Sequence, residues 1–176
     1  LADAEKFLSQ ITDGDRFLSA QIELATLRIK SDRLNQARQQ LAESRQQHPE
    51  IASTLYAVEI ELLNNNHFEE TAYLLALEAL KQFPNDNLLL FSRALMADKR
   101  QELAQFELDM RELLKRDPNN PSYMNAFGYT LADKTDRLAE AEPYLRRAFQ
   151  LKPNDPAIID SIGWLLYKQG HLFEAL

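Results

Sequence analysis

Apolar residues recur at helical spacing in two segments near the C-terminal end of the chain. They stand at Met124, Phe127 and Leu131, and again at Ile159, Ile162 and Leu166. Steps of three or four residues place such side chains on one face of an α-helix. The polar stretches 133–136 and 168–171 follow and predict tight turns before a second helix begins. The pattern therefore predicts helical hairpins.

Four prolines show that the hairpin pattern repeats. Pro49, Pro84, Pro118 and Pro153 are separated by 35, 34 and 35 residues, and each lies in a short polar stretch. Because proline disfavours a helical conformation in the residue before it, each predicts the end of one helix and the start of the next.

Two further series of residues run in phase with the prolines. One comprises Ala37, Ala72, Phe106, Ala141 and Ala175, at steps of 35, 34, 35 and 34. The other comprises Ala25, Glu59, Ala94, Gly128 and Gly163. Small side chains at most of these positions let two helices approach closely. Phe106 and Glu59 depart from this pattern.

The period divides the chain into a half repeat, full repeats and a truncated repeat. Their predicted bounds are 1–14, then about 15–49, 50–84, 85–118 and 119–153, then 154–176. Residues 2–12 are expected to form a lone second helix, and Leu172 to Leu176 to begin another. One hairpin cannot bury its apolar face alone, whereas stacked neighbours can. We predict an all-α fold, an α-solenoid of stacked antiparallel helix hairpins in a single array, and interpret the chain as a fragment of a longer protein.

The repeats resemble a known family. The segments 163–176 (GWLLYKQGHLFEAL) and 151–156 (LKPNDP) look like tetratricopeptide repeats. The resemblance extends over the whole chain and is strongest in the last two repeats. It implies a superhelix whose concave groove, lined by the first helix of each repeat, binds peptides.

A narrower resemblance lies in the segments 125–138 and 160–164. They are similar to repeats of gammaproteobacterial outer-membrane lipoproteins that act as adaptors for periplasmic carboxyl-terminal processing proteases. This resemblance implies such a protease as partner, a lipid anchor outside residues 1–176, and a location at the periplasmic face of the outer membrane. Without it, a cytoplasmic repeat protein is the expectation.

Composition narrows the possible functions. Glycine and proline together make only 11 of 176 residues, too few for the frequent turns of a β-sandwich. The net charge of −7 argues against nucleic acid, whose phosphates are bound by clustered Lys and Arg. The chain has no cysteine, so no disulfide or thiolate site can form. No apolar run approaches the roughly 20 residues of a membrane span.

Candidate catalytic chemistry is sparse. The three histidines, His48, His67 and His171, lie far apart and lack the spacing of a metal site. The four glycines are isolated, so no phosphate-binding loop is predicted. Acid pairs such as Glu69–Glu70 are interpreted as solvated helix faces. We therefore expect no catalytic residue, no metal site and no cofactor.

The phase of the repeats instead predicts partner-binding residues on the inner faces of the first helices. They are Tyr56, Phe91, Leu95, Asn125, Tyr129, Asp160, Trp164 and Lys168. Aromatic side chains dominate binding hot spots, so Tyr56, Phe91, Tyr129 and Trp164 are the predicted anchors. The alternative for each ring is packing against a neighbouring helix. Carboxylate clamping of the kind seen in the family is disfavoured, because only Asn125 suits it and Asp160 has the opposite charge.

These residues predict a non-catalytic scaffold that binds a partner protein or peptide, with the protease adaptor as its specific form. Two alternatives stay open: an assembly or oligomerisation scaffold of the cell envelope, and the recognition arm of a larger enzyme. The segment from Leu172 to Leu176 leaves the apolar face of the last repeat open, which predicts dimerisation through the exposed end.

Overall fold

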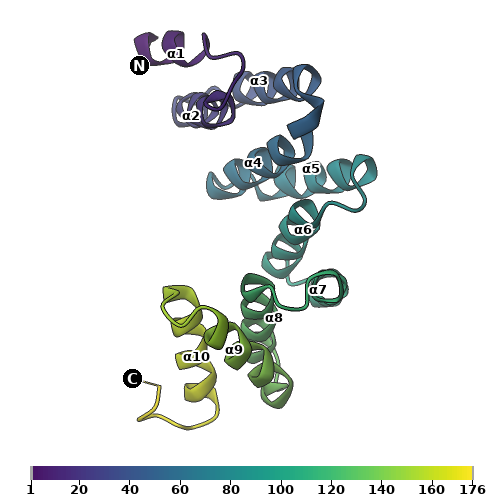
Figure 1. Cartoon of the computed structure of the whole chain (residues 1–176), viewed down its shortest axis with the longest axis vertical. Coiled ribbons are helices and arrows are strands. Elements are labelled where there is room, and N and C mark those ends of the chain that lie inside the picture. Colours follow the sequence, from purple (N-terminus) through teal and green to yellow (C-terminus); the bar gives the residue numbers. More distant parts are fainter. Residues whose placement is uncertain (1, 176) are drawn as a thin grey trace. The chain divides into compact units, whose positions relative to one another are not determined.

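The computed structural model describes residues 2–175, and all the regular structure in that range is helical. Ten α-helices follow one another along these residues (Figure 1). They are α1 (Ala2–Leu8), α2 (Phe17–Lys30), α3 (Leu34–Gln47), α4 (Ala52–Asn65), α5 (Glu69–Gln82), α6 (Asn87–Lys99), α7 (Leu103–Arg116), α8 (Pro121–Lys134), α9 (Leu138–Leu151) and α10 (Pro156–Lys168). A 3₁₀ turn, Pro49–Ile51, precedes α4.

The spacing of the helices follows the spacing of the prolines. The first helices α2, α4, α6, α8 and α10 begin at residues 17, 52, 87, 121 and 156, which are steps of 35, 35, 34 and 35. Each predicted full repeat thus holds two helices.

The two ends of the chain differ from the expectation. The helix predicted over residues 2–12 ends at Leu8, after which the backbone turns toward α2. Near the other end, residues 172–174 form a turn and no second helix has begun. Leu176, the last residue of that prediction, lies outside the described range.

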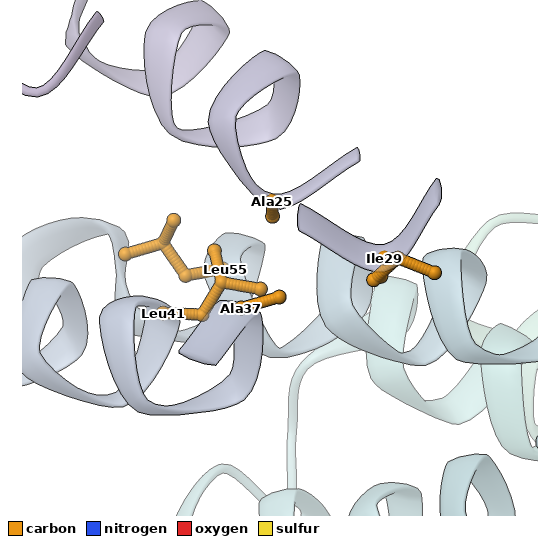
Figure 2. Packing of buried hydrophobic residues seen from close by; sticks show 5 residues of the cluster. All are labelled: Ala25, Ile29, Ala37, Leu41 and Leu55. Atoms are coloured by element: carbon orange, nitrogen blue, oxygen red, sulfur yellow. The ribbon is translucent and has the colours of Figure 1, made fainter. Parts of the chain in front are cut away.

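The helices fall into two compact units, with the division inside α6 after Met96. The first unit buries small and branched side chains between α2, α3 and α4. Figure 2 shows this cluster, formed by Ala25, Ile29, Ala37, Leu41 and Leu55. Ala25 and Ala37 belong to the two small-residue series and are fully buried, so their short side chains allow α2 and α3 to lie close together.

The second unit has a larger aromatic core. Phe106, which stands where other repeats have alanine, is fully buried. Its ring centroid lies 6.2 Å from that of Phe127, and the Phe127 ring meets Tyr144 edge-on at 5.0 Å. Gly128 lies against α9 beside these rings, with no side chain to hold the helices apart. The extra volume of Phe106 is thus accommodated by aromatic packing within the unit.

A side-chain cap followed by a proline marks the start of both α8 and α10. The Asn120 side chain accepts hydrogen bonds from the backbone N–H groups of Ser122 and Tyr123 at the start of α8, and Asp155 accepts one from Ala157 at the start of α10. Pro121 and Pro156 follow these caps directly. A side-chain cap satisfies N–H groups that have no partner in the helix, and proline is preorganised for the first turn.

Candidate partner-binding site

In the first unit, a pocket of about 410 Å³ lies between α4 and α6. Both predicted groove residues of α6, Phe91 and Leu95, line it, and Leu95 remains 38% exposed. The other contributors are Thr54, Ala57, Val58, Ile60, Glu61, Asn64, Asn65, Leu88, Ser92 and Met96. The pocket is therefore largely apolar, with carboxamides at one side.

Tyr56 lies apart from this pocket. Its side chain is buried at 7% exposure, with the Arg45 guanidinium 4.1 Å from the ring centroid. Its hydroxyl oxygen accepts a hydrogen bond of 3.0 Å from Gln82 Nε2 on α5. An anchor for a partner needs an accessible ring, so the structure favours the alternative interpretation of Tyr56, packing between helices.

In the second unit, a pocket of about 600 Å³ is formed by α8, α10 and the segment after α10. Three of the predicted groove residues, Tyr129, Asp160 and Trp164, come together in its wall. The remaining lining residues are Ile159, Gly163, Tyr167, Leu172 and Ala175. Tyr129 and Trp164 belong to different helices and different predicted repeats, as the phase of the repeats implied.

Trp164 is the centre of this wall. Its ring stacks on that of Tyr167, with centroids 5.4 Å apart and planes inclined by 24°. The Lys168 ammonium lies 5.9 Å from the indole centroid. The indole Nε1 is buried and has no hydrogen-bond partner among the described residues. The same holds for Oδ1 of Asn125 on α8.

Tyr129 lies in a negative environment. Its hydroxyl pKa is raised above the usual value of 10, first by partial burial and then by the carboxylates of Asp133, Asp160 and Asp98. Asp98 is itself neutralised by Lys134, whose ammonium is 2.8 Å from Asp98 Oδ1. For Asp133 and Asp160 the described part of the chain supplies no ion pair. The pocket wall therefore includes one carboxylate, that of Asp160, without an ion-pair partner among the described residues.

Sequence reasoning missed Tyr167, which the pocket wall includes together with Ile159 and Leu172. The groove residues predicted on this helix follow one another at steps of four residues, from Asp160 to Trp164 to Lys168. Tyr167 stands three residues after Trp164, and on a helix that neighbour is as close as the one four residues on. The aromatic pair at this spacing was the available signal.

Within residues 2–175, His, Asp and Glu side chains form no cluster of three that could hold a metal ion. Each helix in the same range is too short or too polar to span a membrane.

Paired helices at a period of 34 to 35 residues define an all-α fold, the α-solenoid of tetratricopeptide-repeat proteins. No protein-family model matches the sequence. A TPR repeat-containing protein of Pseudomonas aeruginosa is 43% identical over 167 residues, which are 95% of this chain and 28% of that protein. The chain thus spans little more than a quarter of that relative's length.

Solved structures agree on the fold. A tetratricopeptide repeat protein from Parabacteroides merdae has a TM-score of 0.69 at 15% identity, over 89% of this chain and 62% of its own. YrrB, described as a TPR protein with an unusual peptide-binding site, has a TM-score of 0.62 at 17% identity, over 98% of this chain and 88% of its own. These structures show that the chain has the tetratricopeptide-repeat fold.

Proposed function

We propose that this chain is a non-catalytic scaffold that binds a peptide segment of a partner protein on the inner faces of its first helices. The observation that carries the proposal is the meeting of two predicted anchors, Tyr129 on α8 and Trp164 on α10, in the wall of one pocket. The two rings come from the first helices of successive predicted repeats, which is where the repeat pattern places a binding surface.

The size and lining of this pocket support the same function. Its volume of about 600 Å³ is sufficient for several side chains, and Tyr129, Tyr167 and Trp164 supply aromatic surface. Aromatic residues at a partly desolvated site contribute most of the binding energy in protein interfaces. The peptide-binding site named for YrrB, which shares this fold, supports a peptide as the kind of ligand.

Substitution of the two rings tests the proposal. We expect Trp164→Ala and Tyr129→Ala each to weaken binding of the partner about tenfold or more while the chain stays folded. Phe149→Ala is the matched control, because Phe149 is an aromatic residue of similar exposure, 38%, outside the pocket. The partner is captured from envelope extracts, identified by mass and purified for titration. Unchanged affinity with a lowered melting temperature would show that the rings serve only the fold.

We further propose that the partner is a periplasmic carboxyl-terminal processing protease and that the chain delivers substrates to it at the outer membrane. The support is the similarity of segments 125–138 and 160–164 to lipoprotein adaptors of that kind. The purified protease should degrade its substrates faster with the wild-type chain than with Trp164→Ala. An assembly scaffold that binds through its outer faces would show no such difference, and the recognition arm of a larger enzyme would carry its own catalytic domain.

We also propose self-association through the apolar end of the second unit. Phe173 is 97% exposed, and about half of Leu172, its neighbour in the chain, and of Ile159, which lines the pocket together with Leu172, is exposed. Exposed apolar clusters of this kind mark contact surfaces. Sedimentation should show a dimer at high concentration that Phe173→Ser abolishes; a monomer at every concentration would refute this contact.

A further inference from the structure

The pocket of the second unit combines aromatic walls with an unbalanced charge. Asp160 lines the pocket on α10, and Asp133 lies on α8 near enough to Tyr129 to influence its hydroxyl. No described residue forms an ion pair with either carboxylate, whereas nearby Asp98 is already neutralised by Lys134. One unpaired carboxylate, Asp160, therefore lines the pocket, and a second, Asp133, acts on Tyr129 in its wall.

One cation of the chain already lies near the aromatic wall. The Lys168 ammonium lies 5.9 Å from the Trp164 ring centroid, within the range at which a cation is attracted to the face of an indole. Lys168 is exposed, and none of the described carboxylates lies within ion-pair distance of it. The ammonium therefore lies at the outer limit of that range, and no ion pair with a described carboxylate fixes it there.

We propose that this pocket takes a lysine or arginine side chain of the bound segment, whose cation contacts the Trp164 and Tyr129 rings and pairs with Asp160. The inference rests on the proposed function, since it names the side-chain chemistry that the peptide-binding pocket selects. The aliphatic stem of such a side chain would lie along the apolar wall while its charged end meets the carboxylate.

The charge balance favours a cation over an anion. Counting Asp133, Asp160 and Lys168, the groups without an ion-pair partner sum to one net negative charge, in a chain whose overall charge is −7. Burial is the main cause that raises the pKa of the Tyr129 hydroxyl, and the carboxylates of Asp133, Asp160 and Asp98 raise it further. In this account Lys168 competes with the partner's cation and does not recognise a partner carboxylate.

Peptide pools test this directly, because Trp164 is the single tryptophan of the chain and its fluorescence reports on the pocket. Four pools of heptapeptides, acetylated and amidated, carry Lys, Arg, norleucine or Glu at the centre, with mixtures of Leu, Phe, Ala and Ser at the other positions. Each is titrated into the whole chain at low and at high salt. We expect the Lys and Arg pools to bind about three- to tenfold more tightly than norleucine, with the advantage reduced by salt.

Three variants determine which groups are responsible. Asp160→Asn should remove the advantage of the Lys pool, whereas Asp136→Asn, at an exposed aspartate outside the pocket, should not. Lys168→Gln should strengthen binding of the Lys pool about two- to threefold, because it removes the competing ammonium.

The outcomes separate the two proposals. Equal binding of the Lys and norleucine pools overturns the cation site and leaves the peptide-binding function standing. Tightest binding of the Glu pool, or weaker Lys binding in Lys168→Gln, overturns the cation site in favour of anion recognition. Failure of all four pools to alter Trp164 fluorescence overturns both the cation site and the pocket as a peptide site.

Discussion

Gly128 on α8 faces Leu145 on α9 so closely that a β-carbon at Gly128 would lie 2.7 Å from Leu145 Cγ. The same β-carbon would be 3.1 Å from the carbonyl oxygen of Ala141. Leu145 and Ala141 are fully buried, so neither can move without disturbing the core of the second unit. Close approach of the two helices therefore depends on the missing side chain. Gly163 occupies the equivalent place on α10, where a β-carbon would meet only the Ala175 carbonyl oxygen, at 3.3 Å.

These two glycines should respond differently to the same substitution. We expect Gly128→Ala to lower the free energy of unfolding by about 1–3 kcal/mol, because a methyl group is forced into a packed core. Gly163→Ala should be within about 1 kcal/mol of wild type, since alanine's helix propensity offsets a milder contact. Urea denaturation of both variants measures the difference. A loss for Gly128→Ala as small as that for Gly163→Ala would mean that α8 and α9 can separate at little cost.

Glu59 stands at the position of its repeat that corresponds to Gly128 and Gly163, and an ion-pair network accommodates its larger side chain there. Its carboxylate, 2% exposed, lies 2.9 Å from Arg38 Nε and 2.6 Å from Arg45 Nη1. Glu59→Ala would leave Arg45, whose side chain is only 12% exposed, without its carboxylate. We expect a loss of about 1–3 kcal/mol in unfolding free energy.

The two arginines provide the control for that experiment. Arg38→Ala should cost less than about 1 kcal/mol, because its side chain is 41% exposed and Arg45 still pairs with Glu59. A larger loss for Arg38→Ala than for Glu59→Ala, measured in the same urea series, would contradict this account of the network.

The repeat pattern was sufficient to predict the helices but not what covers each inner face. Proline and small-residue spacing could be read directly, because both report local backbone requirements. The burial of Tyr56 could not, since it depends on Arg45 and Gln82 reaching its ring and hydroxyl from other helices. Among the site residues, the proximity of Tyr129 and Trp164 could be predicted, because they occupy equivalent positions in successive repeats. The unpartnered polar atoms and the charge of the pocket required three-dimensional neighbours.

The sequence also did not predict which turn residues have a strained backbone. Three turns between paired helices place a non-glycine residue in the left-handed region, with φ of 57° at Asp32, 66° at His67 and 62° at Gln101. The turn after α10 uses Gly170 at φ 82° instead. An L-residue in this region costs about 1–2 kcal/mol, whereas glycine adopts it freely.

Gln101→Gly should therefore stabilise the chain. We expect a gain of about 0.5–1 kcal/mol, because relief of the turn exceeds the entropy that glycine adds to the unfolded state. Gln150→Gly, at an exposed glutamine within α9, should instead lose about 1 kcal/mol. Thermal unfolding of the pair checks both signs, and a loss at Gln101 would show that its side chain contributes more than its backbone costs.

The stability of the second unit should fall in acid through Glu107. Arg137 Nη1 lies 2.5 Å from Glu107 Oε1, and Arg111 Nη1 lies 2.6 Å from Oε2. The hydrogen bonds from Arg137 chiefly hold the pKa of the Glu107 carboxyl below its usual 4.5; burial acts in the opposite direction and Arg111 adds to the lowering. The unfolded chain therefore binds this proton at a higher pH than the folded chain does.

It follows that Glu107 contributes its full stabilisation above about pH 4.5 and loses it as the pH falls through the lowered pKa. Glu107→Gln removes the charge, so we expect it to be less stable than wild type by about 1 kcal/mol at pH 7 and equal to it near pH 2. Urea denaturation across this range measures the gap between the two proteins. A gap that stays constant with pH would assign the effect to packing of the glutamate side chain, because only the ionised carboxylate gives a difference that closes in acid.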